Sequence, residues 1–432
     1  MHSSFPRISP SGEAASGVDA RSVRLLPCRR RLHMLRRRAA AAWVLACACA
    51  LHGSVAIAAA TSDAAAASLP LSALPRGATC QRLDLPQRLL AGRRGLFNPA
   101  AARHPRIGWV LLLRFDSCYP QGCGGPWVIR PYAALLGRGL APRPAAARRT
   151  LIELAYTDGT KRRVRDELGN PAVLAGDMRP FVWRGGVYLS HWLLRNNTPE
   201  VEGNALQAVS RLDVGGRAVR LVHLFTRVGA RNVSLTWQKN WGFLPGDDGG
   251  LRMLFTTLPA SIVLRLPADA RAYAAPQFEC GTEVLPAHFG AVEAATGLDL
   301  ASTRNSGNPE PYPAGRGGGL LMLVHTRQPG NRYFHWGVRL AAADLRVTHI
   351  SAGPLLKWND YAGRGFLPGV VSVGSFHVLP DGAAGPPGGG EVLRVFFGEG
   401  DKFSCWEDTA LDRIAWFALP AGAVAPIANP FA

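Results

Sequence analysis

The chain has 432 residues, of which 47% are hydrophobic and 18% are charged, a balance typical of a globular protein. Its formal net charge is +19, but nine arginines lie within the first 38 residues and the others are dispersed through apolar sequence. Because no clustered basic face with interleaved aromatic residues is visible, the charge does not indicate a nucleic acid partner.

The N-terminal part carries a targeting signal. A basic stretch at residues 29–38 leads directly into an apolar run at residues 39–60. As a signal anchor, this run is long enough to span a membrane, with the basic tail 1–38 in the cytosol. As a signal peptide, it offers small residues for cleavage around Ala56–Ala60. Both alternatives export residues 61–432, and we favour a single-pass type II anchor in the Golgi or ER membrane over secretion.

Export would permit two covalent modifications. Sequons begin at Asn196 and Asn232, so both asparagines are candidates for N-glycosylation. An oxidising lumen would allow disulfides among the five cysteines that follow the apolar run, which are Cys80, Cys118, Cys123, Cys280 and Cys405. Five is an odd number, and none of these cysteines has the spacing of a zinc site, so no metal is predicted.

The rest of the chain shows a repeat. Residues 61–90, rich in Ala, Ser and Pro, predict a stem. Beyond them, glycine opens an apolar run at Gly108, Gly186, Gly250, Gly319 and Gly390, with spacings of 78, 64, 69 and 71 residues. Several runs form the second arm of a hairpin, as in FVWRGGVYLS. Long helical periodicity is scarce, so the repeat predicts an all-β, five-bladed β-propeller over residues 91–422, with a large β-sandwich as the alternative.

A propeller has a central channel that its innermost strands line. We therefore expect polar groups on or just after the five runs to converge there. These are Arg114, Ser190 or His191, Thr256 or Thr257, His325, and Asp401 after the last run.

Four segments carry more polar chemistry than a scaffold requires. They supply Asn98 and Arg114, Asp177 and Arg179, Lys239 in WQKNWGF, and Asp401 in FFGEGDKF. Lys239 lies between two tryptophans although only 4 of the 49 basic residues are lysines. A compact ammonium that pairs with a carboxylate or a sugar hydroxyl cannot be replaced by a guanidinium.

Each candidate also has a structural interpretation. An aspartate two residues before an arginine, as in Asp177 and Arg179, is more often a loop ion pair or a turn cap than a catalyst. Asp401 could be a turn residue. His325 and His335 lie on apolar strands and could be hydrogen-bonded core histidines or pocket residues.

The order of these motifs resembles a known family. FNP with LLLR, DMRPFVWRGGVYLS, KNWGF, a strand ending in histidine followed by YFHW, and FGEGD are similar to the five-bladed propellers of glycoside hydrolase family 130. The related glycosyltransferase family 108 shares the pattern, and the resemblance covers roughly residues 90–420. It implies phosphorolysis, hydrolysis or transfer of β-mannosyl groups without a cofactor, so that inorganic phosphate or a sugar phosphate could serve as a substrate.

The resemblance also implies roles for single residues. Asp177 would be the proton donor, and the predicted substrate-binding residues are Asn98, Arg114, Arg179, Lys239, His325, His335 and Asp401. From the chemistry alone, inverting transfer to phosphate needs one positioned acid and several cationic donors. The family motif Glu-Asp-Pro-Arg is changed here to Gly176-Asp177-Met178-Arg179. An inactive propeller that only binds glycans is therefore the alternative function.

Overall fold

The computed structural model describes residues 81–82, 96–116, 129–137, 152–157, 175–194, 205–213, 218–225, 227–232, 240–271, 274–313, 318–357, 370–381, 390–399 and 403–432. Nearly all of these residues belong to β-strands and their turns, with one α-helix, α3 (Phe289–Thr296). In this part of the chain, no helix is long and apolar enough to cross a membrane. The predicted tail at 1–38 and anchor at 39–60 lie outside the described residues.

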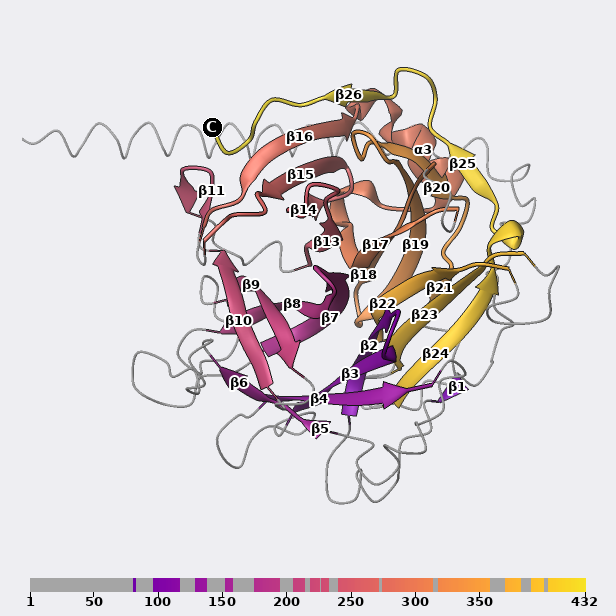
Figure 1. The fold of residues 1–432 in the computed structure, drawn as a ribbon. Helices are drawn as coiled ribbons and strands as arrows, with labels where there is room; N and C mark the ends of the chain where they lie inside the picture. Colours follow the sequence, from indigo (N-terminus) through magenta and orange to yellow (C-terminus); the bar gives the residue numbers. More distant parts are fainter. Residues whose placement is uncertain are drawn as a thin grey trace, which may run out of the picture. The chain divides into compact units, whose positions relative to one another are not determined.

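The strands form a five-bladed β-propeller (Figure 1). Blade 1 contains β2 (Leu96–His104), β3 (Gly108–Asp116), β4 (Ile129–Leu136) and β5 (Ile152–Glu153). Blade 2 contains β7 (Ala175–Trp183), β8 (Gly186–Leu194), β9 (Ala205–Asp213), β10 (Ala218–Phe225) and β6 (Ala155–Thr157). Blade 3 contains β13 (Gly242–Pro245), β14 (Leu251–Thr256), β15 (Ala260–Leu266), β16 (Gln277–Val284) and β26 (Val424–Pro426).

The last two blades complete the ring. Blade 4 contains β17 (Arg304–Pro311), β18 (Gly319–Gln328), β19 (Arg332–Ala341), β20 (Val347–Ser351) and β25 (Trp416–Ala418), with β21 (Leu356–Lys357) beside β19. Blade 5 contains β22 (Val371–Leu379), β23 (Val392–Glu399), β24 (Phe403–Ala410) and β1 (Gln81–Arg82). A separate hairpin joins β11 (Arg227–Val228) and β12 (Arg231–Asn232). Two strands of the blades, β1 and β26, lie outside the predicted propeller range of residues 91–422.

The five innermost strands are β2, β7, β13, β17 and β22, and each contacts its two neighbours around the axis. The glycine-led apolar runs are therefore not the innermost strands that we expected. They form β3, β8, β14, β18 and β23, which are the second strands of their blades. A second strand has a hydrogen-bonded partner on each edge and a packed blade on each face, so an uninterrupted apolar run suits it.

Strand β3 shows how such a run is used. Side chains alternate between the two faces of a strand. Leu111 and Leu113 pack in a cluster with blade 5, whereas Val110 and Leu112 pack in a cluster with blade 2. All four are at most 1% exposed. Burying each of them contributes roughly 1.5–3 kcal/mol, and this contribution holds neighbouring blades together.

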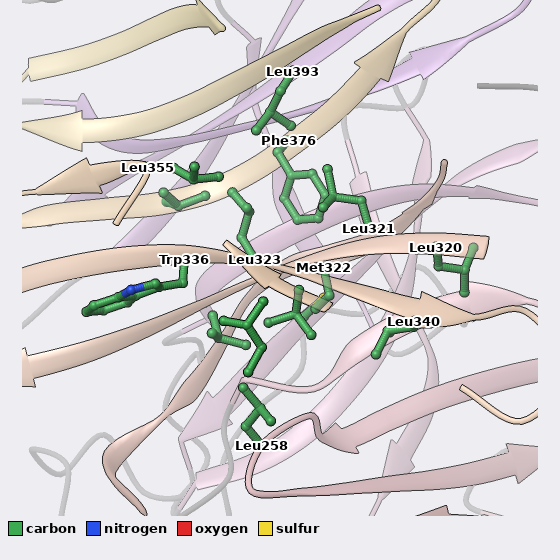
Figure 2. Close-up of a cluster of buried hydrophobic side chains, with 14 of the residues drawn as sticks. Leu258, Leu320, Leu321, Met322, Leu323, Trp336, Leu340, Leu355, Phe376 and Leu393 are labelled. Carbon is green, nitrogen blue, oxygen red and sulfur yellow. The ribbon is translucent and has the colours of Figure 1, made fainter. Parts of the chain in front are cut away.

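The largest core cluster joins blades 3, 4 and 5. Figure 2 shows Leu321 and Leu323 of blade 4 beside Phe376 of blade 5, and Trp336 and Leu393 belong to the same cluster. The indole N–H of Trp336 donates to the carbonyl of Thr296 at the end of α3, at 3.0 Å, so this helix is fixed to the outside of the cluster. The core therefore lies between the blades.

Two asparagines of β17 connect blade 4 to other blades. Asn308 accepts a hydrogen bond from the backbone N–H of Phe243 on β13 at 3.0 Å and donates to the carbonyl of Pro180 on β7 at 3.2 Å. Asn305 accepts from the hydroxyl of Thr257 at 2.7 Å and donates to the carbonyl of Leu254 on β14 at 3.1 Å. Because the blades are separate sheets, these side chains supply hydrogen bonds where no backbone ladder exists.

We expect Asn308→Ala to destabilise the fold. The substitution leaves a buried N–H and a buried carbonyl without partners, which costs roughly 2–4 kcal/mol. Urea unfolding of the variant and of Gln328→Ala, an exposed control, would measure this difference. An unchanged free energy of unfolding for Asn308→Ala would contradict the proposed link between blades.

Candidate functional site

Bulges interrupt the innermost strands near their N-terminal ends. The register between the first and second strands shifts between Phe97 and Ala100, Gly176 and Arg179, Ser306 and Glu310, and Val373 and Ser375. Asn98 and Asp177 lie in the first two bulges with φ angles of 52° and 51°, in the left-handed region. Asparagine and aspartate tolerate this region better than most residues. The left-handed conformation still costs energy in them, and residues that adopt it are often found at functional sites. The bulges turn these two side chains away from the regular pleat.

A cavity of about 360 Å³ opens where these bulges meet. Its lining includes six of the predicted site residues, which are Asn98, Arg114, Asp177, Arg179, His325 and His335. These residues come from β2, β3, β7, β18 and β19, so three blades contribute them. The cavity residues of β2 and β7 lie near the N-terminal ends of these strands, whereas those of β3 and β18 lie near the C-terminal ends. This follows because successive strands of a blade are antiparallel.

Other predicted site residues are not in this group. Lys239, Asp401 and Asn196 lie outside the described residues, as does the side chain of Asn232. Ser190, His191, Thr256 and Thr257 are described, but they do not line the cavity. His191 hydrogen-bonds to the hydroxyl of Ser210 at 2.8 Å, and Thr257 bonds to Asn305. They lie on or beside second strands, whose side chains face neighbouring blades more often than the channel.

The carboxylate of Asp177 contacts a hydrogen-bond donor on one oxygen and a cation on the other. Its Oδ2 accepts a hydrogen bond from the indole N–H of Trp192 at 3.0 Å, and its Oδ1 lies 3.8 Å from Nη1 of Arg114. The side chain of Asp177 remains 21% exposed. The carboxylate is thus fixed in direction and still reachable from the cavity.

Arg179 is a buried cation. It is 5% exposed, and burial lowers its pKa to about 10, although the charge of Asp177 acts in the opposite direction. The guanidinium is therefore still charged at neutral pH. Its Nη2 donates to the carbonyl of Asn305 at 3.4 Å, but its buried Nε has no partner among the described residues. A charged, buried arginine in the lining of a cavity suits an anionic ligand.

Two histidines share the hydroxyl of Ser306. Nδ1 of His325 lies 2.7 Å from this oxygen, and Nδ1 of His335 lies 3.3 Å from it. Nε2 of His335 donates to the carbonyl of Val371 at 2.7 Å, so Nδ1 of a neutral His335 is an acceptor. One assignment satisfies both contacts: Ser306 donates to His335 and accepts from Nδ1 of His325. Nε2 of His325 is then an acceptor as well.

Both imidazoles are neutral at physiological pH. Burial lowers the pKa of His335 to about 4, partly opposed by its bond to Val371. Burial also lowers the pKa of His325 well below its ordinary value, and the neighbouring His335 and Arg179 lower it further. Among the lining residues that the structure describes, the positive charge therefore resides on the arginines.

Buried neutral histidines make stability depend on pH. The pKa of His191, like that of His335, is lowered by burial to about 4, while both would titrate near 6.5 in the unfolded chain. Unfolding then takes up protons, so this contribution is complete above pH 6.5 and is lost as the pH falls toward 4. We expect urea unfolding to show lower stability at pH 5.5 than at pH 7.5, with a shallower dependence in His191→Gln. Equal stabilities at the two pH values would contradict the burial of neutral imidazoles.

The cavity also contains polar residues that the sequence did not single out. They are Asn240, Ser306, Arg327, Asn331, Tyr333 and Ser372. Asn240 directly follows Lys239 in WQKNWGF, and Tyr333 begins the YFHW motif, so these motifs could have identified both residues. The oxygens Oδ1 of Asn98 and Asn240 are buried and have no partner among the described residues. Both residues line the cavity, where an amide side chain can bond to ligand hydroxyls.

Similarity to known proteins is confined to structure. No protein family model and no curated protein matches the chain. A glycosyl hydrolase from Bacteroides ovatus is 13% identical, has a TM-score of 0.52, and aligns over 81% of this chain and 98% of its own. The chain has the fold of a solved glycosyl hydrolase. At this identity the similarity establishes the five-bladed propeller and no activity.

Two further solved structures resemble the chain more distantly. A hypothetical protein from Leishmania major is 10% identical, with a TM-score of 0.43 over 82% of this chain and 94% of its own. A β-1,2-mannobiose phosphorylase from Listeria innocua is 13% identical, with a TM-score of 0.43 over 74% of this chain and 90% of its own.

Proposed function

We propose that the protein is a carbohydrate-active enzyme that transfers a glycosyl group, most simply a β-mannosyl group, between a sugar and phosphate. Asp177 is the general acid in this proposal. Arg114 and Arg179 bind the phosphate, and the neutral histidines and the two asparagines bind sugar hydroxyls. The β-mannosyl preference rests on the order of the sequence motifs.

The observation that carries this proposal is the charge of the cavity. Its described lining contains three arginines, Arg114, Arg179 and Arg327, and one carboxylate, Asp177. With neutral histidines the described lining has an excess of two positive charges. Neutral sugars do not compensate such an excess, whereas a phosphate or a sugar phosphate does.

The one carboxylate in the described part of the lining supports the same reaction class. Inverting hydrolysis needs a second carboxylate that activates water, on the opposite side of the glycosidic bond from the acid. Phosphate is already a nucleophile and needs only to be bound and aimed. Among the described residues of the lining, Asp177 is the one acidic side chain.

Product analysis tests the proposal. The purified full chain would be offered three pairs: β-mannobiose with phosphate, mannose 1-phosphate with mannose, and GDP-mannose with mannose. We expect turnover with one or both of the first two pairs. Turnover with GDP-mannose alone would make the protein a nucleotide-sugar glycosyltransferase, and mannan binding without any turnover would make it a glycan-binding propeller.

We also propose that the protein acts in the secretory pathway. Five cysteines follow the apolar run at residues 39–60, and Cys280 is free whereas Cys405 is disulfide-bonded. Without Cys280, the number of cysteines that can form disulfides is even. A disulfide supports an oxidising compartment.

In a eukaryotic host, the wild-type chain is expected to lose mass on N-glycanase treatment, whereas the double variant Asn196→Gln and Asn232→Gln should not. An unchanged mass of the wild type, with the chain exposed to the cytosol, would contradict this location.

A further inference from the structure

The side chain of Trp192 occupies the space beside Gly176. The two residues are opposite each other on β8 and β7. A β-carbon added at Gly176 would lie 1.8 Å from Cζ2 and 2.1 Å from Cε2 of the indole. Real atoms do not approach so closely, so no other residue fits at position 176 while the ring is in place. Trp192 is 1% exposed and therefore has little room to move aside.

The same ring contacts both charged groups of the site. Its Nε1–H donates to Oδ2 of Asp177 at 3.0 Å. The guanidinium of Arg114 lies over its face, 5.7 Å from the ring centroid, within the range of a cation–π contact. Arg114 in turn lies 3.8 Å from the other oxygen of Asp177. The indole thus fixes the carboxylate from one side and supports the arginine that faces it from the other.

The backbone of Asp177 explains why a donor is useful there. Asp177 has a left-handed φ of 51°, a conformation that costs energy outside glycine. A hydrogen bond to a charged group is stronger than one between neutral groups and helps to offset this strain. A phenyl ring would occupy much of the same space but would supply no hydrogen bond to the carboxylate.

We propose that Trp192 is a positioning residue that orients the Asp177 carboxylate toward the cavity, and that Gly176 is glycine because this indole needs its space. The proposal rests on the proposed function in one respect, the role of Asp177 as general acid. The indole of Trp192 occupies the space that a side chain at position 176 would need. The changed motif is therefore compatible with an active site.

Trp192→Phe tests the role of the N–H, because it retains an aromatic ring and removes the donor. We expect kcat to fall at least tenfold with little change in KM. Asp177 must be protonated to act as an acid, and the lost hydrogen bond favoured its charged form. The alkaline limb of the pH profile should therefore move up by about one pH unit. An unchanged kcat and an unchanged pH profile would overturn the proposal.

Trp183→Phe is the matched control. The indole N–H of Trp183 is a hydrogen-bond donor like that of Trp192, but its acceptors are the backbone carbonyls of Gly249 and Gly250. Trp183 does not line the cavity. This variant should lose stability and keep both kcat and the pH profile. If the two variants behave alike, the effect of Trp192→Phe is structural and the positioning role is wrong.

A spectroscopic measurement separates this proposal from the proposed function. In the full chain labelled with ¹⁵N-tryptophan, the signal missing from Trp192→Phe identifies the Trp192 indole. Asp177→Asn should shift this signal more than any other tryptophan signal, and Gly176→Ala should shift it as well. An unshifted signal would overturn the contact. Absence of turnover in the wild type with a shifted signal would instead overturn only the proposed reaction.

Discussion

Asp177→Asn is expected to reduce turnover by about 10²–10⁴-fold, the usual contribution of a general acid. The amide keeps the shape of the carboxylate, and its oxygen can still accept the indole N–H of Trp192, which lies 3.0 Å away in the wild type. Folding and ligand affinity should therefore change little. Steady-state rates and calorimetric binding of the sugar would measure the two effects separately.

Asp213→Asn is a matched control for this variant. Asp213 pairs with Arg220 at 3.0 Å on the outer part of blade 2, and neither residue lines the cavity. We expect this variant to retain wild-type turnover. A similar rate for Asp177→Asn and the wild type would reduce Asp177 to a structural ion-pair residue and would favour the glycan-binding alternative.

Arg179→Met is expected to lower kcat/KM for phosphate at least about 30-fold. Removing one partner of a buried charge pair costs roughly 2–5 kcal/mol, and every 1.36 kcal/mol corresponds to a factor of ten. The loss should appear mainly as a higher KM for phosphate. Initial rates at a fixed sugar concentration and increasing phosphate would measure it.

Arg339→Met provides the control for the removal of a half-buried guanidinium. Arg339 lies 4.0 Å from the ring centroid of Trp416 and 4.6 Å from that of Tyr312, outside the cavity lining. Its replacement should lower stability and leave the KM for phosphate unchanged. Equal KM values for Arg179→Met and the wild type would exclude Arg179 from the phosphate site.

The sequence predicted the fold class because second strands carry a strong signal. β18 reads GLLMLVHT, and both of its faces are buried between blades. The innermost strands could not be recognised in the same way. β17 reads RNSGNPEP, which resembles a loop, yet Asn305, Ser306 and Asn308 are all at most 7% exposed. A strand that faces a polar channel needs polar side chains, and its free edge tolerates proline and bulges.

The residues of the candidate site were predicted in part, for a related reason. Asp177, Arg114 and His325 stand in motifs with a recognisable order, and the structure brings them into one cavity. Trp192 has no signal of its own, because its contact with Asp177 depends on the cross-strand register of β7 and β8. Ser306 joins two histidines only because β17 and β19 flank β18. Such contacts follow from pairing between distant segments, which local patterns do not encode.

The release of sugar phosphate from β-mannobiose, measured with and without inorganic phosphate, tests the central claim most directly. A cavity with three arginines and one carboxylate in its described lining predicts mannose 1-phosphate as a product, at a rate that saturates with phosphate and falls to near zero without it. Release of free mannose at the same rate in both reactions would contradict the account, because water rather than phosphate would then be the acceptor.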